Sequence, residues 1–251
     1  MIKVRRETER RHVQRGEHEV WHTFYPEAAR PNQGADHFAV LATFNEIRLP
    51  PGGVWTPHPP EAAEILTYVY RGALAQEDST GTCGVLHAGE FQRMTVGRRA
   101  LHKETNASRG HWAHVFRLVL HPVQTGSDGA HEQRRFAAAQ RHNVLCAVAS
   151  PDGRKGSLPI LQDALLYSSV LDPGHHLIHE LLPNRSVWLH LICGEATLHD
   201  VVLNQGDGAG VTGEPAVSFT AREHTEILLI DLGSALRPPL ADGPAVTDGV
   251  S

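Results

Sequence analysis

The sequence predicts an all-β protein built from two similar halves. Short apolar runs rich in β-branched residues recur along the chain, and Gly, Pro, Asp and Asn separate them. An extended segment leads to a Pro-Gly turn twice, at Pro51-Gly52 and at Pro173-Gly174. Many short strands at this spacing are typical of sandwiches and barrels. The interval of roughly 120 residues between the two turns is far too long for a solenoid repeat.

The first half contains three clear strand signals. Apolar runs cover residues 38–44, 65–70 and 115–120, and the strand at 65–70 leads to a glycine, Gly72. Turn signals lie between these runs, for example at 50–53 and 78–81. We therefore assign residues 1–125 to an N-terminal barrel.

A short helix is predicted between the halves. Over residues 131–140, Phe136 and Ala139 can share one face of a helix. Because this stretch falls between two strand-rich regions, we expect residues 126–142 to form a helical linker.

The second half repeats the pattern of the first. Its strand signals are the apolar runs at 144–149, 165–171, 187–192 and 226–231, and the third run leads to Gly194. These features assign residues 143–234 to a C-terminal barrel. The remaining residues, 235–251, are rich in Pro, Gly and Ala without periodicity, and we expect them to be a disordered tail.

The bulk composition is that of an ordinary soluble globular protein. Hydrophobic residues make up 41% and charged residues 20%, and the formal net charge is -5, which disfavours direct binding to nucleic acid. The first twelve residues are charged and lack the apolar core of a secretory signal, and no apolar run could span a bilayer. The cytoplasm is therefore the expected location. In that reducing compartment Cys83, Cys146 and Cys193 are expected to be free thiols.

The 18 histidines make a metal site worth seeking. His102 and Glu104 stand two apart in a predicted strand, so both can face a barrel interior. His58 follows a Pro-Gly turn on a neighbouring strand. Two imidazoles and one carboxylate converging with open positions is the facial arrangement typical of non-haem iron(II).

Two stretches of the first half resemble the two cupin motifs as variants. The first contains Gly52, His58, Glu64 and Gly72, and resembles G-x5-H-x-H-x3,4-E-x6-G. The second contains Gly89, Gly97, His102 and Asn106, and resembles G-x5-P-x-G-x2-H-x3-N.

Within the cupins, the chain is most similar to the pirin family. The similarity lies in segments of both halves, in order, and covers about residues 3–233; the segments are 58–59, 64–69, 72–74, 78–81, 89–94, 102–106, 149–153, 162–164 and 206–209. The resemblance implies two cupin barrels, that is, double-stranded β-helix or jelly-roll barrels, joined by a short linking helix. It also implies a metal pocket in the N-terminal barrel and quercetin 2,3-dioxygenase-like chemistry.

The ligand set implied by the resemblance is incomplete. Pro60 occupies the second His position of the first motif, and Gln76 stands where the family carries a further His. The surviving ligands are His58, His102 and Glu104, with water completing the shell and Glu61 as a candidate substitute. One divalent metal is expected, Fe2+ first, with Mn, Co, Ni, Cu and Zn as alternatives. Glu104 would also be the catalytic group, taking the proton of a substrate hydroxyl.

Two functions stay open from the sequence. In the first, the protein is a metal-dependent dioxygenase of small aromatic, flavonol-like substrates. In the second, it is a metal-free binding or regulatory protein that acts on a protein partner or a small molecule. Pro60 favours the second function and the intact His102-x-Glu104-x-Asn106 favours the first. The oligomeric state is open.

Three other patterns carry less weight. The histidines of 175–180 would divide between the two faces of a strand, which makes a poor single site. The G-x-G-x-x-G at 208–213 is followed by Pro215 and a strand pattern, so we expect a barrel turn instead of a nucleotide site. His114 is expected at a surface or an edge.

Overall fold

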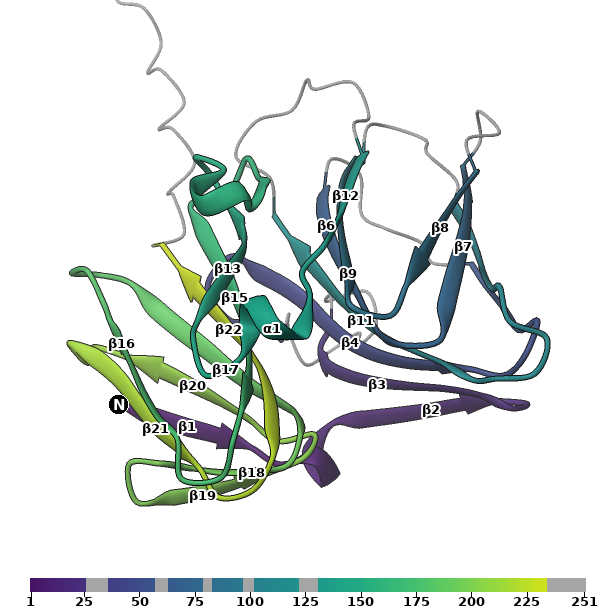
Figure 1. The fold of residues 1–251 in the computed structure, drawn as a ribbon. Helices are drawn as coiled ribbons and strands as arrows, with labels where there is room; N and C mark the ends of the chain where they lie inside the picture. Colours follow the sequence, from purple (N-terminus) through teal and green to yellow (C-terminus); the bar gives the residue numbers. More distant parts are fainter. Residues whose placement is uncertain (26–35, 57–62, 79–82, 97–101, 122–130, 234–251) are drawn as a thin grey trace, which may run out of the picture.

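The computed structural model describes residues 1–25, 36–56, 63–78, 83–96, 102–121 and 131–233. Its strands form two seven-stranded and two four-stranded sheets. Each half of the molecule contains one sheet of each size. The two halves lie side by side, with the first half in blue and the second in green and yellow in Figure 1. The all-β fold with two barrels is therefore confirmed.

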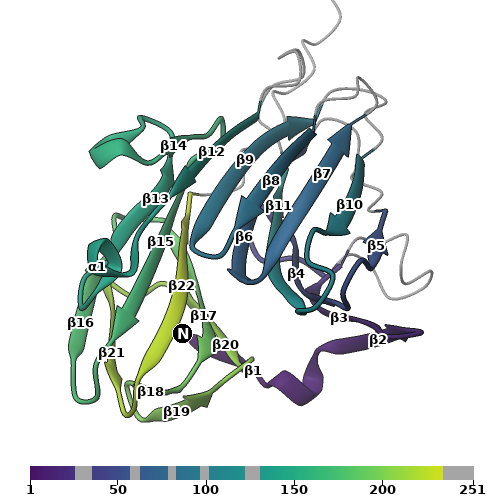
Figure 2. The ribbon, with the colours of Figure 1, turned by 45° about the vertical axis from the view of Figure 1, so that its right-hand side comes forward.

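The N-terminal barrel has a large sheet in the order β12-β9-β6-β11-β4-β3-β2 and a small sheet in the order β5-β10-β7-β8. Figure 2 shows these two sheets facing each other. The strands are β2 (Arg11–Arg15), β3 (His18–Phe24), β4 (Leu41–Leu49), β5 (Val54–Trp55), β6 (Ala63–Arg71), β7 (Ala73–Asp78), β8 (Cys83–His87), β9 (Glu90–Val96), β10 (His102–Asn106), β11 (Ala113–Leu120) and β12 (His131–Arg135).

The C-terminal barrel repeats this plan, with a large sheet in the order β1-β20-β17-β22-β15-β13-β14 and a small sheet in the order β16-β21-β18-β19. Its strands are β1 (Ile2–Arg5), β13 (Cys146–Ser150), β14 (Leu158–Pro159), β15 (Ala164–Leu171), β16 (His176–Glu180), β17 (Ser186–Cys193), β18 (Glu195–Leu198), β19 (Val201–Asn204), β20 (Gly208–Thr212), β21 (Ala216–Ala221) and β22 (Thr225–Leu232). The helical elements are η1 (Glu7–Glu9), α1 (Ala138–Arg141) and η3 (Arg154–Gly156).

The central strands of the large sheets are buried on both faces. In β6, Ile65 and Val69 pack with the apolar residues inside the N-terminal barrel, while Leu66 and Tyr68 belong to the cluster that contains Trp188 and residues of β22. Side chains alternate along a strand, so one face of β6 fills its own barrel and the other meets the second barrel. The continuous apolar sequence of such strands follows from this double burial.

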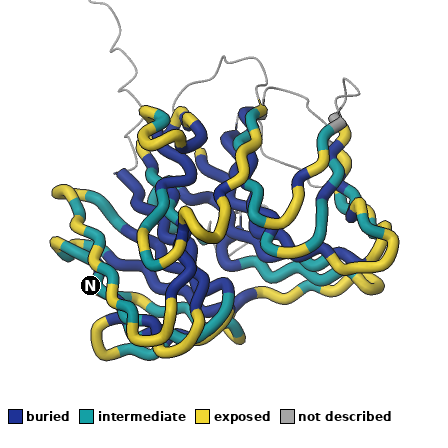
Figure 3. The backbone as a smooth tube through the Cα atoms, in the orientation of Figure 1, coloured by how far each residue is buried: buried dark blue, intermediate teal, exposed yellow. Residues whose placement is uncertain are grey.

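The largest hydrophobic core lies between the barrels. One cluster joins Phe44, Phe116 and Leu118 of the first half to Trp188 and Ile230 of the second. Figure 3 shows the buried chain concentrated along the strands where the two halves meet. The two large sheets therefore pack face to face and hold the halves together as one body.

The predicted helix at 131–140 is largely wrong. Residues His131–Arg135 form β12, which pairs with β9 from His131 opposite Met94 to Arg135 opposite Glu90. The helix α1 covers four residues, Ala138–Arg141. The pairing with β9 supplies backbone hydrogen bonds that outweigh a weak local helix preference, and the exposed charged side chains suit an edge strand.

The assignment of residues 1–125 to the N-terminal barrel also needs a correction. Strand β1 pairs with β20, from Ile2 opposite Val211 to Arg5 opposite Gly208, so the first strand adds to the C-terminal barrel. Without β1, one side of β20 would be an unpaired edge, and covering such an edge satisfies its backbone groups. Among the described residues, no helix is long and apolar enough to cross a membrane.

Candidate functional site

The interior of the N-terminal barrel is layered. Two apolar clusters lie inside it, one containing Val69 and Val115 and the other containing Ile65 and Val119. On β6 and β11 the positions midway between these residues share the same face, and they are occupied by Thr67 and Arg117, both buried. A polar layer therefore separates two apolar layers inside the barrel.

Glu104 is the central acid of this polar layer. It lies on β10, opposite Gln76 on β7 and opposite Trp55 on β5, and its exposed fraction is 0%. Its Oε1 accepts a hydrogen bond from Nε2 of Gln76 at 3.1 Å and another from Nη2 of Arg117. Glu104 and Arg117 thus form a buried ion pair across the barrel interior.

Several polar atoms of this layer have no hydrogen-bond partner among the described residues. They are Oε2 of Glu104, Oε1 of Gln76, and Nε and Nη1 of Arg117, whose guanidinium carbon lies 4.9 Å from the centre of the Trp55 ring. Buried polar groups are nearly always paired in folded proteins, so these atoms are available to a bound polar ligand or to residues outside the described part of the chain. Carboxylate and amide oxygens can ligate a divalent metal, and buried N–H groups bind anionic oxygen. Within the described residues, Glu104 can therefore supply one carboxylate ligand to a metal, and Arg117 can bind an anionic oxygen of a ligand.

Burial also sets the protonation of Glu104. Removal from water raises the pKa of this carboxyl, while the charge of Arg117 and the hydrogen bonds from Gln76 and Arg117 act to lower it. The net effect is a raised pKa. A carboxyl whose pKa is raised is suited to exchanging a proton with a bound molecule.

Most of the predicted ligand set cannot be placed in the structure. His58 and Glu61 lie outside the described residues, as does Pro60. His102 begins β10, two positions before Glu104, but only its backbone belongs to the described part. Within the described ranges, no three His, Cys, Asp or Glu side chains are grouped so that they could hold a metal ion.

Two residues of the sequence motifs stabilise the fold instead of lining the polar layer. The Asn106 side chain donates to the carbonyls of Leu49, Pro50 and His111 at 3.1, 3.0 and 2.8 Å, which ties the end of β10 to neighbouring segments. Glu64 points away from the barrel interior and accepts the backbone N–H of Leu161 at 2.9 Å from its Oε2. Glu64 therefore joins the two barrels.

The interior of the C-terminal barrel contains an apolar cluster with Leu189, Val217 and Leu229, and the buried Asp231 follows Leu229 on the same face of β22. His179 on β16 is bound to Asp231, with 2.8 Å between its Nε2 and the carboxylate. The G-x-G-x-x-G stretch lies mostly on strand β20, where a side chain at Gly208 would collide with Trp188, so it is a strand of the barrel and not the expected turn.

Sequence reasoning missed two functional candidates. Arg117 is the one charged residue within the apolar run of β11. A charged residue in such a run was the sequence signal that could have identified it as a candidate. His114, expected at a surface or an edge, is 9% exposed and contacts Oε1 of Glu46 at 2.8 Å. The barrel that covers His114 comes from the other half of the chain, so the local sequence could not indicate its burial.

Two family models match the chain. The model described as Pirin matches residues 7–120, and the model described as Quercetinase C-terminal cupin domain matches residues 147–232. A curated quercetin 2,3-dioxygenase from Escherichia coli is 35% identical over 233 residues, which cover 92% of this chain and 99% of that protein. A putative quercetin 2,3-dioxygenase from Pasteurella multocida is 34% identical and covers 78% of this chain and 84% of its own length.

The structure is similar to solved structures over nearly its whole length. A bacterial pirin from Escherichia coli, solved in complex with nickel(II), superposes with a TM-score of 0.84 at 34% identity. The match covers 93% of this chain and all of that one.

Proposed function

Because the chain belongs to the pirin family, we propose that it is a metal-dependent dioxygenase of the quercetin 2,3-dioxygenase type. The substrate class is a small aromatic, flavonol-like molecule, as the names of the relatives suggest. The observation that carries the proposal is the polar layer of the N-terminal barrel, where Glu104, Gln76 and Arg117 keep unpaired polar atoms in a fully buried place.

The proposed ligands of one divalent metal are His58, His102 and Glu104. Oε2 of Glu104 is unpaired in the described part of the chain, and it supplies the carboxylate ligand. Alternation along β10 places position 102 on the same face as Glu104. Fe2+ remains the first expectation, and the nickel(II) bound by the Escherichia coli pirin makes Ni2+ a direct competitor. When bound, the metal supplies a Lewis-acidic centre for an electron-rich substrate.

The chain's own residues orient this carboxylate and the substrate. Gln76 and Arg117 both bind Oε1 of Glu104, which fixes the carboxylate plane and leaves Oε2 directed elsewhere. The unpaired Nε and Nη1 of Arg117 can receive an anionic oxygen of the substrate. Glu104 would take the proton that the substrate hydroxyl releases, because a carboxylate beside the metal can exchange one partner for another.

The test compares metal content and oxygen uptake in matched variants. Wild type, His102→Ala, Glu104→Gln and the control Glu77→Gln are loaded with Fe, Mn, Co, Ni or Cu, analysed for bound metal and given quercetin. Glu77 is an exposed acid on the neighbouring strand β7, so it controls for charge alone. We expect wild type and Glu77→Gln to bind metal and consume oxygen, with both properties reduced at least about tenfold in the other two.

Two outcomes would contradict the proposal. Stoichiometric metal that survives both His102→Ala and Glu104→Gln would place the metal elsewhere. A wild-type protein that takes up none of the five metals would favour the alternative of a metal-free binding protein, to which Pro60 points.

A further inference from the structure

A cavity lies between the two barrels, away from the polar layer. Its volume is about 470 Å³, and it is lined by Arg48, Tyr70, Arg71 and Trp112 of the first half and by Cys193 and Gln205 of the second. Glu104 and Arg117 do not line it. Cavities of this size at a junction between domains are typical of small-molecule sites.

The cavity forms where equivalent strand ends of the duplicated halves meet. Strand β6 ends with Tyr70 and Arg71 before Gly72, and β17 ends with Cys193 before Gly194. Both glycines have positive φ, 79° and 84°. A side chain would approach the Trp112 carbonyl within 2.6 Å at Gly72 and the His224 carbonyl within 2.4 Å at Gly194. The turns next to the cavity are therefore closely packed against backbone, which favours a preformed site.

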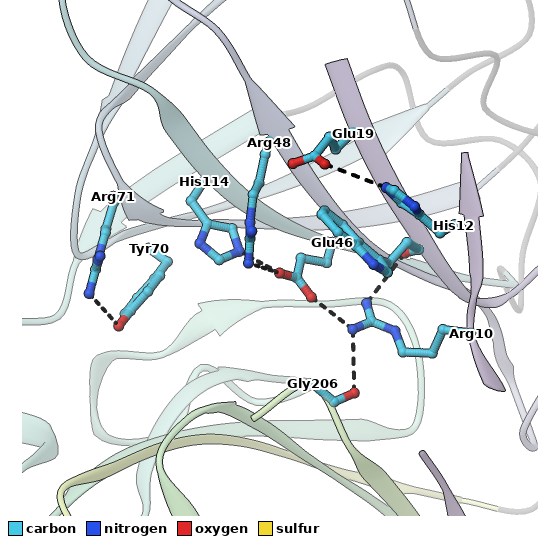
Figure 4. Close-up of polar contacts among 10 residues, drawn as sticks. Arg10, His12, Glu19, Glu46, Arg48, Tyr70, Arg71, His114 and Gly206 are labelled. Atoms are coloured by element: carbon cyan, nitrogen blue, oxygen red, sulfur yellow. Dashed lines mark hydrogen bonds and ion pairs between the residues drawn. The ribbon is translucent and has the colours of Figure 1, made fainter. Parts of the chain in front are cut away.

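The wall formed by the first half is rich in positive charge. Glu46 is shared by Arg10, Arg48 and His114, at 2.7, 3.2 and 2.8 Å, so one carboxylate faces two guanidinium groups and an imidazole (Figure 4). Arg10 also reaches the Gly206 carbonyl of the second half, at 3.3 Å. Glu46 thus carries one negative charge between two guanidinium groups, and Glu19, opposite Arg48 in the sheet, is a second acid of this wall.

Arg71 adds a cation without an acidic partner. Its Nη2 donates to the neutral Tyr70 hydroxyl at 3.2 Å, and its guanidinium carbon lies 4.9 Å from the centre of the Tyr70 ring. Among the described residues, no carboxylate is within ion-pairing distance of Arg71. Glu19, the acid that lines the cavity, instead contacts His12 at 3.7 Å. A guanidinium with free N–H groups is the preferred partner of a carboxylate.

Aromatic surface accompanies these cations. Trp112 is 46% exposed, although it lines the cavity, and the Tyr70 ring lies beside Arg71. Large exposed aromatic side chains beside a cation can stack on a planar ligand while the cation binds its charge.

We propose that this interbarrel cavity binds a small aromatic carboxylate. The ring of the ligand packs against Trp112 and Tyr70, and its carboxylate is held by Arg71 with Arg48 nearby. This site is independent of the proposed dioxygenase chemistry, because none of its residues belongs to the polar layer of the N-terminal barrel.

The experiment titrates metal-free protein with 4-hydroxybenzoate by calorimetry and compares the neutral analogue 4-hydroxybenzyl alcohol. We expect the carboxylate to bind at least about tenfold more tightly than the alcohol, since a charge-assisted hydrogen bond is lost with the alcohol. Arg71→Ala should weaken binding of the carboxylate by a similar factor. Arg71 is exposed, so its removal should leave the fold intact. Arg135→Ala, which removes an exposed arginine of β12, and Glu104→Gln should both bind like wild type.

A second measurement locates the ligand. Alkylation of each cysteine by iodoacetamide is followed by peptide mass spectrometry with and without 4-hydroxybenzoate. The probe should slow alkylation of Cys193, which lines the cavity, and leave Cys146 unchanged. Equal affinity for the acid and the alcohol, or unchanged affinity in Arg71→Ala, would overturn the proposal. Loss of binding in Glu104→Gln would place the ligand in the barrel instead.

Discussion

At the scale of single residues, the buried charge of the N-terminal barrel is balanced by a partner from the facing sheet. Glu104 on β10 meets Arg117 on β11, which stands opposite Thr67 and Asn45 in the large sheet. Two charges taken out of water are tolerated only when paired and hydrogen-bonded. The atoms that remain unpaired on both side chains, within the described part of the chain, are free to bind a ligand.

Asn106 is predicted to hold the rim of the barrel. Asn106→Ala removes the amide that serves three carbonyls, so we expect the free energy of unfolding to fall by about 1–3 kcal/mol. Urea unfolding of the metal-free protein measures this change. Lys103→Ala, an exposed position of the same strand, is the control and should change stability by less than about 0.5 kcal/mol. An Asn106→Ala variant as stable as the control would contradict the assignment.

From the sequence, the site could be predicted only where the alternation of side chains along one strand was sufficient. The spacing of His102 and Glu104 indicated that both could face the barrel interior, and Glu104 is indeed buried there. Gln76 appeared only as a departure from the family pattern. Arg117 could not be paired with Glu104 in advance, because their contact depends on how two separate sheets face each other.

At the scale of elements, the turn after β6 requires glycine for two reasons. Gly72 has a φ of 79°, and a Cβ there would lie 2.6 Å from the Trp112 carbonyl. Gly52 also has a positive φ, 67°, but a Cβ there would meet nothing within 4 Å. Comparing substitutions at the two positions therefore separates the cost of backbone strain from the cost of close packing.

This difference gives a matched pair of variants. Gly52→Ala should cost about 1–2 kcal/mol for the left-handed backbone alone. Gly72→Ala should cost roughly 1–3 kcal/mol more, because the methyl group also displaces the backbone at Trp112. Thermal and urea unfolding of both variants measure the difference. Equal losses of stability in the two variants would show that the backbone at Trp112 moves away from the added methyl group without cost.

The elements that sequence reasoning missed are those that long-range pairing creates. The strand β12 has the charged sequence of an exposed helix, and its pairing with β9 decides its conformation. Likewise, β1 lies at the start of the chain but pairs with β20, more than two hundred positions later in a 251-residue chain. By contrast, β6, β11 and β22 were predicted because double burial leaves an apolar run in the local sequence.

At the scale of the whole molecule, buried polar contacts cross the interface between the barrels. Arg141 donates to Glu226 at 2.6 Å and to Tyr68 at 3.2 Å, and burial together with the Glu226 charge raises the pKa of that tyrosine. Arg10 joins Glu46 to Gly206 at another place on the interface. Because breaking such contacts leaves unpaired charge in a buried place, the two barrels should unfold together.

The interface also predicts how stability depends on pH. Burial alone would raise the pKa of Glu46, but the hydrogen bonds and charges of His114 and Arg10 lower it well below its ordinary value of 4.5. A carboxylate whose pKa is lowered in the folded state stabilises the protein above the unfolded-state value. This stabilisation is lost as the pH falls from that value toward the folded-state pKa.

We therefore expect Glu46→Gln to lower the free energy of unfolding by about 3 kcal/mol near neutral pH. The difference in unfolding free energy between variant and wild type should shrink as the pH falls below 4.5. The ionised Glu46 of the folded wild type then contributes less to stability, because protonation begins to favour the unfolded state. Urea unfolding at a series of pH values measures the gap, and Glu77→Gln, an exposed acid, is the control that should show none. A gap that stays constant down to acid pH would mean that Glu46 contributes through packing instead of charge. Two unfolding transitions, with only one displaced by Glu46→Gln, would show that the barrels unfold separately.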